Sequence, residues 1–227
     1  MMIPKKIHYC WFGGNDLSPM SIKCMDSWRA KLPDFEILRW DEKNSNISDP
    51  IVSYALKRKM WAFAADFVRL KVLYEHGGIY LDTDMELVQS LSPLLDNACF
   101  FGAESDGVIS CGVIGARPKN PFIAECIKHM EQEFSAGKKF VTMPRIITSA
   151  YRRSRLKGEV KIYSRHVFYP FNPYDSQQPV KQLLYQDVTP DTFAIHHWEK
   201  SWKQGLLYKT YYKFNNISVA LLSRLFK

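Results

Sequence analysis

The chain has 227 residues, a length that fits one domain. Hydrophobic residues make up 46% of the sequence and charged residues 24%, an ordinary globular balance with enough apolar material for a core. The formal net charge of +8 indicates an anionic partner, which can be nucleic acid, a membrane surface or a phosphorylated substrate. No RNA- or DNA-binding signature is present, so we expect no nucleic-acid partner.

The five cysteines are odd in number and form no CxxC pair. This pattern favours buried thiols in a reducing compartment over a disulfide framework or a zinc site. The N-terminus has no long apolar segment of the signal-peptide kind, and no stretch approaches the ~18 apolar residues of a membrane-spanning helix. We therefore expect a cytoplasmic protein, either free or peripheral at the inner face of the cell membrane.

Strands and helices alternate in the first part of the chain. Residues 3–12 and 35–40 are predicted to be strands. Ser18-Pro19 and Asp49-Pro50 each place a capping residue before a proline, so a helix is expected to begin at each pair.

The clearest helix is expected over residues 61–76, where aromatic and apolar side chains recur with the 3.6-residue period of one buried face. Gly77 follows as the expected C-terminal glycine in left-handed geometry. Ile79 to Leu81 then form a short apolar run without polar alternation, which is typical of a strand buried on both faces.

The second part of the chain continues the alternation. We expect strands at 100–103 and 108–116, helices from Asn120-Pro121 to 134 and from Pro144 to 155, weaker strands at 160–163 and 167–169, a loop-rich segment at 170–190 and a last strand at 192–195. Alternating strands and helices predict an α/β sandwich with a largely parallel central sheet.

Asp82 and Asp84 come directly after the apolar run at 79–81. In open α/β sheets ligands bind beyond the carboxyl ends of the strands, so a site is expected here. Residues i and i+2 on extended backbone project to one side, and two carboxylates so close repel each other without a cation. The pair therefore predicts a site for Mg²⁺ or Mn²⁺ held together with substrate phosphates, in preference to a solvated acidic turn.

Asp66 and Arg69 lie three residues apart on the preceding helix and can face the same neighbour. One interpretation is a surface ion pair, which stabilises little. The other is a pair whose carboxylate and guanidinium bind sugar hydroxyls.

Trp11 ends the first predicted strand, just before two glycines. It either stacks on a nucleobase or packs in the core beside a tight turn. His196 and His197 follow the last predicted strand, and either is a structural histidine or completes the metal site. Lys200 can neutralise a diphosphate.

Short blocks with a distinctive order occur along the chain. They are Ile3-Pro4-Lys5-Lys6-Ile7-His8, Trp11-Phe12-Gly13-Gly14, Ala65-Asp66-Phe67-Val68-Arg69, Gly77-Gly78-Ile79-Tyr80-Leu81-Asp82-Thr83-Asp84, His196-His197-Trp198 and Ser201-Trp202. Together they resemble glycosyltransferase family 32, the group with a DXD-containing sugar-binding region, and the Asp66–Asp84 block is highly specific. The large clostridial glucosylating toxins look like distant relatives through the same blocks.

This resemblance implies a GT-A fold with a Rossmann-like sheet, a nucleotide-sugar donor, a divalent cation and retention of the anomeric configuration. By the same resemblance Asp82 and Asp84 are catalytic, the donor is bound by Trp11, Asp66, Arg69, Tyr80, Lys200 and Trp202, and Mn²⁺ or Mg²⁺ is held by Asp82, Asp84 and His196, with His197 as the alternative to His196. The chain departs from the family at Thr142-Met143-Pro144 and at Cys111-Gly112, near the expected sugar pocket. These departures leave the donor sugar open.

We expect a retaining, metal-dependent glycosyltransferase that moves a hexose or N-acetylhexosamine from a nucleotide-sugar, with UDP-sugars favoured over GDP-sugars. The expected acceptor is a saccharide, free or lipid-linked, in capsule, O-antigen or exopolysaccharide synthesis. Transfer to a protein side chain is the first alternative. A non-catalytic carbohydrate-binding module is the second, and the Asp-x-Asp pair argues against it because such a module needs no metal–diphosphate site.

Residues 1–205 are expected to form the GT-A catalytic domain, followed by a basic, aromatic tail at 206–227 without acidic residues. The tail is expected either to dock on the sheet as a helix or to contact an anionic membrane surface.

Overall fold

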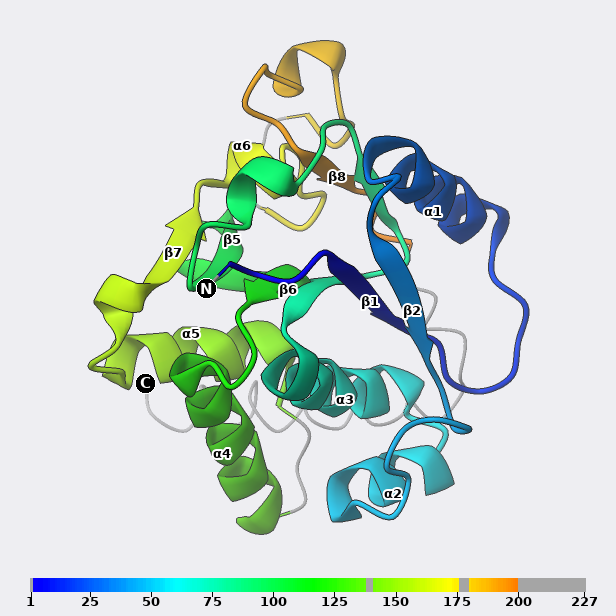
Figure 1. Ribbon diagram of the computed structural model, residues 1–227, viewed down its shortest axis with the longest axis vertical. Helices are drawn as coiled ribbons and strands as arrows, with labels where there is room; N and C mark the ends of the chain where they lie inside the picture. Colours follow the sequence, from blue (N-terminus) through cyan, green and yellow to red (C-terminus); the bar gives the residue numbers. More distant parts are fainter. Residues whose placement is uncertain (1, 138–140, 176–179, 200–227) are drawn as a thin grey trace, which may run out of the picture.

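A six-stranded sheet forms the centre of the protein (Figure 1). The structure is a computed structural model that describes residues 2–137, 141–175 and 180–199. In spatial order the strands are β2 (Glu36–Trp40), β1 (Lys6–Cys10), β3 (Gly78–Leu81), β6 (Val108–Ala116), β5 (Cys99–Ser105) and β7 (Val160–Tyr163). Within this sheet β6 runs antiparallel to β3 and β5, while the remaining strands share one direction. The prediction of a largely parallel sheet is confirmed.

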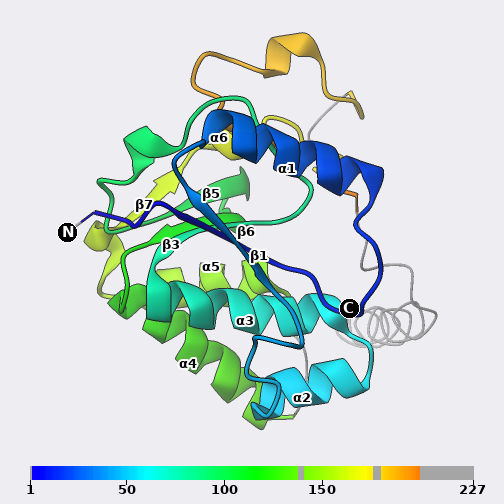
Figure 2. The ribbon, with the colours of Figure 1, turned by 45° about the vertical axis from the view of Figure 1, so that its right-hand side comes forward.

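Helices cover both faces of the sheet. They are α1 (Pro19–Lys31), α2 (Pro50–Lys57), α3 (Trp61–His76), α4 (Pro121–Ser135), α5 (Met143–Arg153) and α6 (Arg165–Phe168), with short 3₁₀ turns at Ser92–Leu94, Lys157–Glu159 and Tyr185–Asp187. Figures 1 and 2 show α3, α4 and α5 on one side of the sheet and α1 and α6 on the other. Among the described residues, no helix combines the length and the apolar character required to cross a bilayer. The layers form the expected α/β sandwich.

Three helices begin where the sequence predicts. The side chains of Ser18, Asp49 and Asn120 accept hydrogen bonds from backbone N–H groups two or three residues further on, at 2.9 to 3.0 Å for the shortest bond of each. A proline occupies the next position in each case. Each capping side chain satisfies a donor that the helix itself leaves free, a contribution of about 1 kcal/mol.

Strand β3 is buried on both faces, as predicted. Ile79 and Leu81 belong to the apolar core on the α1 side, and Tyr80 belongs to the core on the α3 side. Side chains alternate along a strand, so Asp82 follows Tyr80 toward the α3 side of the sheet. The Tyr80 hydroxyl donates to Oδ1 of Asp82 over 3.2 Å.

The connection from α3 to β3 passes through Gly77. Its φ of 62° is positive as expected, but its ψ is −166°, so the prediction of left-handed helical geometry is wrong. This combination of angles is reached essentially by glycine alone. A Cβ atom at Gly77 would also lie 2.6 Å from Cδ of Pro118. Glycine therefore lets the chain enter β3 directly after the helix, at Gly78.

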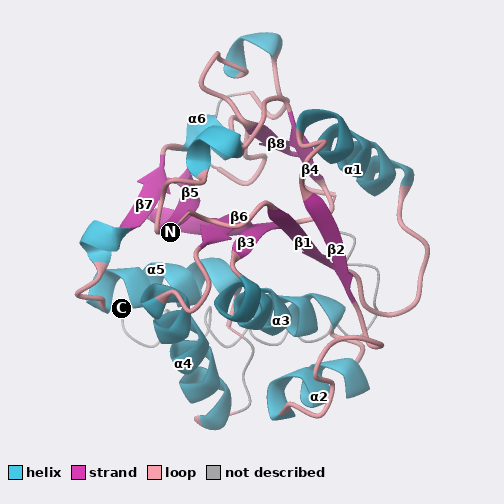
Figure 3. Ribbon diagram, viewed as in Figure 1, coloured by secondary structure: helices cyan, strands magenta, loops and turns pink. Residues whose placement is uncertain are grey.

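A second, two-stranded sheet pairs β4 (Met85–Leu87) with β8 (Ala194–His196) in antiparallel orientation, beside α1 (Figure 3). The sequence does not predict β4, because three residues are too few for a pattern. It places the last strand two residues early. The predicted strand at 167–169 is wrong: Val167 and Phe168 lie in helix α6, because a short apolar run is equally compatible with a buried helix.

Candidate active site

A pocket of about 580 Å³ opens at the edge of the sheet where the parallel strands end. Of the predicted site residues, Trp11, Asp66, Arg69, Tyr80, Asp82, Asp84 and His196 line it. Lys200, Trp202 and the 206–227 tail lie outside the described residues. Strands β1, β3 and β5 all contribute their carboxyl ends, which is where ligands bind in open α/β sheets.

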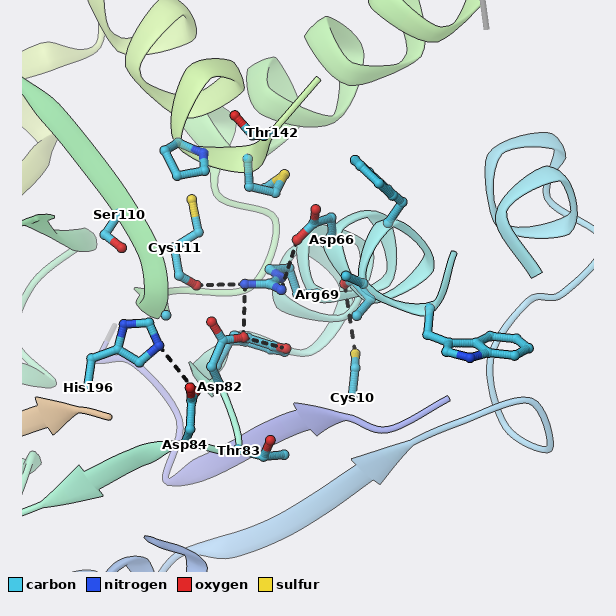
Figure 4. A pocket seen from close by; sticks show the side chains of 18 of the residues that line it. Cys10, Asp66, Arg69, Asp82, Thr83, Asp84, Ser110, Cys111, Thr142 and His196 are labelled. Carbon is cyan, nitrogen blue, oxygen red and sulfur yellow. Dashed lines mark hydrogen bonds and ion pairs between the residues drawn. The ribbon is translucent and has the colours of Figure 1, made fainter. Parts of the chain in front are cut away.

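The two aspartates of the Asp-x-Asp pair converge with His196 (Figure 4). One potential ligand atom from each of the three side chains lies within 4.8 Å of the others. The backbone is not extended here, contrary to expectation: the Met85 N–H donates to the Asp82 carbonyl over 3.0 Å and closes a tight turn. This turn, and not strand alternation, brings the carboxylates of Asp82 and Asp84 together.

His196 reaches this cluster through the pairing of β4 with β8. Met85 pairs with His196, and the His197 N–H donates to the Asp84 carbonyl over 3.0 Å. The two adjacent histidines point to different partners. Nε2 of His196 lies 3.2 Å from Oδ1 of Asp84, whereas Nε2 of His197 lies 2.8 Å from Oε2 of Glu86. Geometry therefore favours His196 over His197 as the third ligand.

Charge stabilises the contact between Asp84 and His196. Burial alone would raise the pKa of Asp84, but the nearby His196 outweighs it and lowers this pKa below its ordinary value. Burial would likewise lower the pKa of His196, but Asp84 raises it above the ordinary histidine value. Each group therefore favours the charged form of the other.

The cluster fits a divalent cation on chemical grounds. Two carboxylates and an imidazole are ligands that Mn²⁺ accepts, and a carboxylate-rich set also suits Mg²⁺. Nδ1 of His196 is buried and has no hydrogen-bond partner among the described residues. Buried polar atoms are normally satisfied, so this atom marks an environment that is incomplete in the protein alone.

Asp66 and Arg69 form a buried pair, so the interpretation as a surface ion pair is wrong. Nη2 of Arg69 lies 2.9 Å from Oδ1 of Asp66, and the side chains are 7% and 13% exposed respectively. Nη1 of Arg69 also contacts Oδ1 of Asp82 at 3.2 Å and donates to the Cys111 carbonyl over 2.8 Å. The guanidinium thus joins helix α3 to the turn after β3 and to β6 (Figure 4).

Burial gives this network unusual proton affinities. It raises the pKa of Asp66 to about 7, with Arg69 opposing and Asp82 adding to the shift. Burial alone would lower the pKa of Arg69, but Asp82, Tyr80 and Asp66 raise it further above its ordinary value. The guanidinium also lies over the Tyr80 ring, 4.4 Å from its centroid. A fixed cation therefore stands beside a carboxyl that gains or loses a proton near neutral pH.

Two tryptophans, Trp11 and Trp61, contribute to the pocket wall. Trp11 follows β1 and is partly exposed, and its indole N–H donates to the Asn15 carbonyl over 2.7 Å. Trp61 lines the same pocket, and a Cβ atom at Gly13 would lie 2.8 Å from its ring. A glycine at position 13 therefore allows Trp61 to approach the backbone beside Trp11. A half-buried indole at a pocket wall is available to stack on a flat ligand.

Glu104 is a pocket residue that the sequence analysis misses. It lies near the carboxyl end of β5, and burial raises its pKa, with Ser110 and His196 acting in the opposite direction. A lone glutamate in a predicted strand has no distinctive spacing. Its position at the end of a parallel strand, the same rule that singles out Asp82, is the signal that could have found it.

Both predicted departures from the family pattern lie in the pocket. Cys111 and Gly112 contribute to its wall from β6, and Thr142, Met143 and Pro144 contribute from the start of α5. Oδ2 of Asp82 would lie 3.3 Å from a Cβ atom at Gly112. Larger side chains at these positions would change the shape of the pocket beside the Asp-x-Asp turn.

Sequence comparison identifies relatives of the same chemical class. The profile described as "Glycosyltransferase sugar-binding region containing DXD motif" matches residues 18–101, a segment that contains Asp66, Arg69, Asp82 and Asp84. An uncharacterised glycosyltransferase of Acanthamoeba polyphaga mimivirus is 27% identical over 221 residues, which are 90% of this chain and 86% of that protein. Inositol phosphoceramide mannosyltransferase 3 of Schizosaccharomyces pombe is 27% identical over 66% of this chain, but the match spans only 46% of the yeast protein.

Comparison of folds agrees with the sequence. The galactosyltransferase LgtC, solved with donor and acceptor sugar analogues, superposes with a TM-score of 0.52 at 19% identity. The match covers 86% of this chain and 87% of LgtC. At this identity the likeness concerns the fold, which is GT-A. The chain is therefore a glycosyltransferase with the GT-A fold, and over residues 18–101 it is similar to the family whose sugar-binding region contains a DXD motif.

Proposed function

We propose that this protein is a retaining hexosyltransferase that moves a hexose or N-acetylhexosamine from a nucleotide-sugar, preferably a UDP-sugar, to a saccharide acceptor. The observation that carries the proposal is the convergence of Asp82, Asp84 and His196 beside the buried Asp66–Arg69 pair in one pocket. A binding module that recognises sugar alone needs no metal–diphosphate site beside such a pair. Transfer from a nucleotide-sugar can use both, the cation at the diphosphate and the pair at the sugar.

Asp82, Asp84 and His196 would hold the divalent cation, Mn²⁺ or Mg²⁺. When bound, the cation supplies charge that stabilises the departing diphosphate as negative charge grows on it. The electrostatic preference of the site follows from the chain itself: two carboxylates in one turn attract a cation, and His196 already pairs with one of them.

Each of the remaining pocket residues would bind a different part of the donor. Asp66 and Arg69 offer acceptors and donors for the hydroxyls of the transferred sugar, because their side chains line the pocket and are fixed by burial. Trp11 would stack on the base. Tyr80 orients Asp82 through its hydroxyl. Lys200 and Trp202 would complete the contacts with the donor, as the family resemblance implies.

Retention is proposed to proceed by attack of the acceptor hydroxyl on the face that the diphosphate leaves. Three carboxylates of the pocket are engaged by other side chains: Asp66 and Asp82 contact the Arg69 guanidinium, and Asp84 contacts the His196 imidazole. These contacts make each of the three a poor nucleophile. Glu104 lies in the same pocket with a raised pKa and is placed to orient the acceptor hydroxyl.

For the acceptor we propose a lipid-borne saccharide at the inner face of the cell membrane, in capsule, O-antigen or exopolysaccharide synthesis. The yeast relative is named for mannosyl transfer to inositol phosphoceramide, which is a lipid acceptor. The match spans 46% of the yeast protein, so we use its substrate as support for a lipid acceptor and not for the identity of the lipid. The basic 206–227 tail is proposed as a membrane contact, and transfer to a protein side chain remains the alternative.

Nucleotide release tests this function. Purified full-length protein would be incubated with UDP- and GDP-sugars and Mn²⁺, with and without a lipid-linked saccharide, beside an Asp84→Asn variant. We expect release from one class of donor that rises with acceptor and disappears with Asp84→Asn. Donor-independent or Mn²⁺-independent release that the variant retains would contradict the proposal.

A further inference from the structure

Positive charge is concentrated in one segment of the sequence. Residues 134–158 contain seven lysines and arginines and no aspartate or glutamate, in a protein whose net charge is +8. Arg145, Arg152 and Arg153 are exposed on α5, and Arg155 is exposed just beyond it. We call these four residues the basic strip.

The basic strip begins at the pocket. Arg145 lines the pocket although it is exposed, so it lies at the rim. Arg145 and Arg152 are seven residues apart, so they share one side of the helix and are separated by about 10 Å along its axis. That side faces away from Ile146 and Ile147, which are buried against the sheet. The strip therefore runs from the pocket rim along the outer side of α5.

A second contact ties the strip to the pocket. Nη2 of Arg152 donates to the carbonyl of Gly107 over 3.3 Å, in the turn between β5 and β6. The next residue, Val108, lines the pocket. Glu104, which we propose to orient the acceptor hydroxyl, lines the same pocket and lies on β5, just before this turn. Arg145 and Arg152 thus lie beside the part of the pocket that β5 and the β5–β6 turn form.

The arginines of the strip lack anionic partners. Among the described residues, no carboxylate lies within 4.0 Å of any of the four. In contrast, Arg29, Arg39 and Arg165 each contact an aspartate. Neighbouring like charges repel each other, and an external polyanion relieves that repulsion and gains Coulomb energy over the whole strip.

We propose that the basic strip binds an anionic lipid surface and holds the pocket against the membrane, an inference that rests on the proposed lipid-borne acceptor. Arginine guanidiniums suit phosphate headgroups because they donate in a planar fork. Single-stranded nucleic acid fits the surface less well, since it requires exposed aromatic rings for stacking. Tyr151, the aromatic residue of helix α5, is half-buried with its ring edge-on to Phe122.

Vesicle co-sedimentation of the full-length chain tests the inference. The probes are phosphatidylcholine vesicles with and without phosphatidylglycerol. The test variant replaces Arg152, Arg153 and Arg155 with glutamine and leaves the pocket residue Arg145 unchanged. The matched control removes the same charge from Lys23, Lys31 and Lys43, which are exposed on α1 and after β2.

We expect the protein to bind only the anionic vesicles and the test variant to bind about tenfold or more weakly, whereas the control binds nearly as the parent does. Because the 206–227 tail is unchanged in every sample, undiminished binding of the test variant would overturn the inference. Equal losses in variant and control, binding to neutral vesicles, or tighter binding of a single-stranded oligonucleotide than of anionic vesicles would also overturn it.

Transfer measured with a water-soluble saccharide separates this inference from the proposed function. The test variant should retain that activity and its melting temperature, since its three substitutions lie outside the pocket. Vesicle binding that depends on the arginines, in a protein that uses no donor, would refute the proposed function and leave the surface assignment standing. Transfer activity, together with undiminished vesicle binding by the test variant, would refute the surface assignment and leave the proposed function standing.

Discussion

Replacing Arg69 with alanine should reduce the free energy of unfolding by about 3–5 kcal/mol, the cost of leaving buried charge without its partner. The guanidinium contacts Asp66 at 2.9 Å, Asp82 at 3.2 Å and the Cys111 carbonyl at 2.8 Å. Its removal leaves two carboxylates facing each other with a carbonyl that loses its donor. Part of the cost is expected to fall as Asp66, whose pKa is already about 7, takes up a proton.

The protein contains a matched control with the same spacing. Asp26 and Arg29 also lie three residues apart on a helix and contact each other at 2.7 Å. Their side chains are 63% and 59% exposed, against 13% and 7% for Asp66 and Arg69. Because solvent screens an exposed pair, Arg29→Ala should cost only about 0–1 kcal/mol.

Urea unfolding measures both values. For a domain of this size 3–5 kcal/mol also corresponds to a fall in melting temperature of about 6–20 °C. The double variant Asp66→Asn/Arg69→Met should recover part of the loss, since it removes a carboxylate together with the guanidinium. If Arg69→Ala costs no more than Arg29→Ala, the buried network does not hold α3 to the turn after β3, and the reasoning fails.

Three further variants test the site and the core. Asp84→Asn should abolish transfer, and Mn²⁺ should no longer raise its melting temperature. If Mn²⁺ still raises the melting temperature of this variant, Asp84 is not a ligand of the cation. Trp11→Ala should weaken nucleotide binding by about 1–3 kcal/mol, with much of it recovered in Trp11→Phe, whereas unchanged affinity and a lower melting temperature would indicate a core role. His8 is buried between the Gly77 carbonyl and the Trp40 indole N–H, and burial lowers its pKa from 6.5 to about 4. The unfolded chain therefore binds more protons below pH 6.5, so His8 should lower stability by about 3 kcal/mol as the pH falls from 6.5 to 4. The measurement is the difference in urea midpoint between the parent protein and His8→Gln at each pH. Asp66 contributes equally to both proteins, so its opposite pH dependence cancels in this difference. A difference in midpoint that does not change with pH would refute the prediction for His8.

The parts of the fold that sequence predicts are those governed by neighbouring residues. A capping side chain followed by proline marks the start of α1, α2 and α4, because the donors it satisfies lie within three residues. The apolar run before Asp82 marks β3, and the rule that ligands bind at carboxyl ends of strands then locates the pocket.

The parts that sequence does not predict depend on contacts between distant segments. Strand β4 exists because it pairs with β8, more than a hundred residues later. The same pairing decides that His196 and not His197 lies at the cluster, a choice that two adjacent histidines leave open. Burial of Arg69 likewise follows from its contacts with Asp82 and with β6, which no local pattern reveals.

Asp84 also accepts a backbone hydrogen bond, and for this reason Asp84→Ala and Asp84→Asn should have different effects on the structure. Its Oδ1 lies 3.2 Å from Nε2 of His196, and its Oδ2 accepts the Glu199 N–H over 2.9 Å, so its carboxylate holds the last described segment of the chain. Asparagine retains an oxygen that can accept from Glu199, whereas alanine offers none. Asp84→Ala should therefore speed amide hydrogen exchange at Glu199 by about fivefold or more, roughly the loss of 1 kcal/mol of hydrogen-bond free energy, while Asp84→Asn changes it less.

Amides of α3 serve as the internal control and should exchange alike in both variants. Equal exchange at Glu199 in the two variants would mean that this segment is held by β4–β8 pairing alone. Faster exchange at Glu199 in Asp84→Ala than in Asp84→Asn would mean that the alanine variant loses activity for two reasons, the lost charge and the loosened segment that carries His196. The loss of activity in Asp84→Asn would then be the one that measures the effect of the charge.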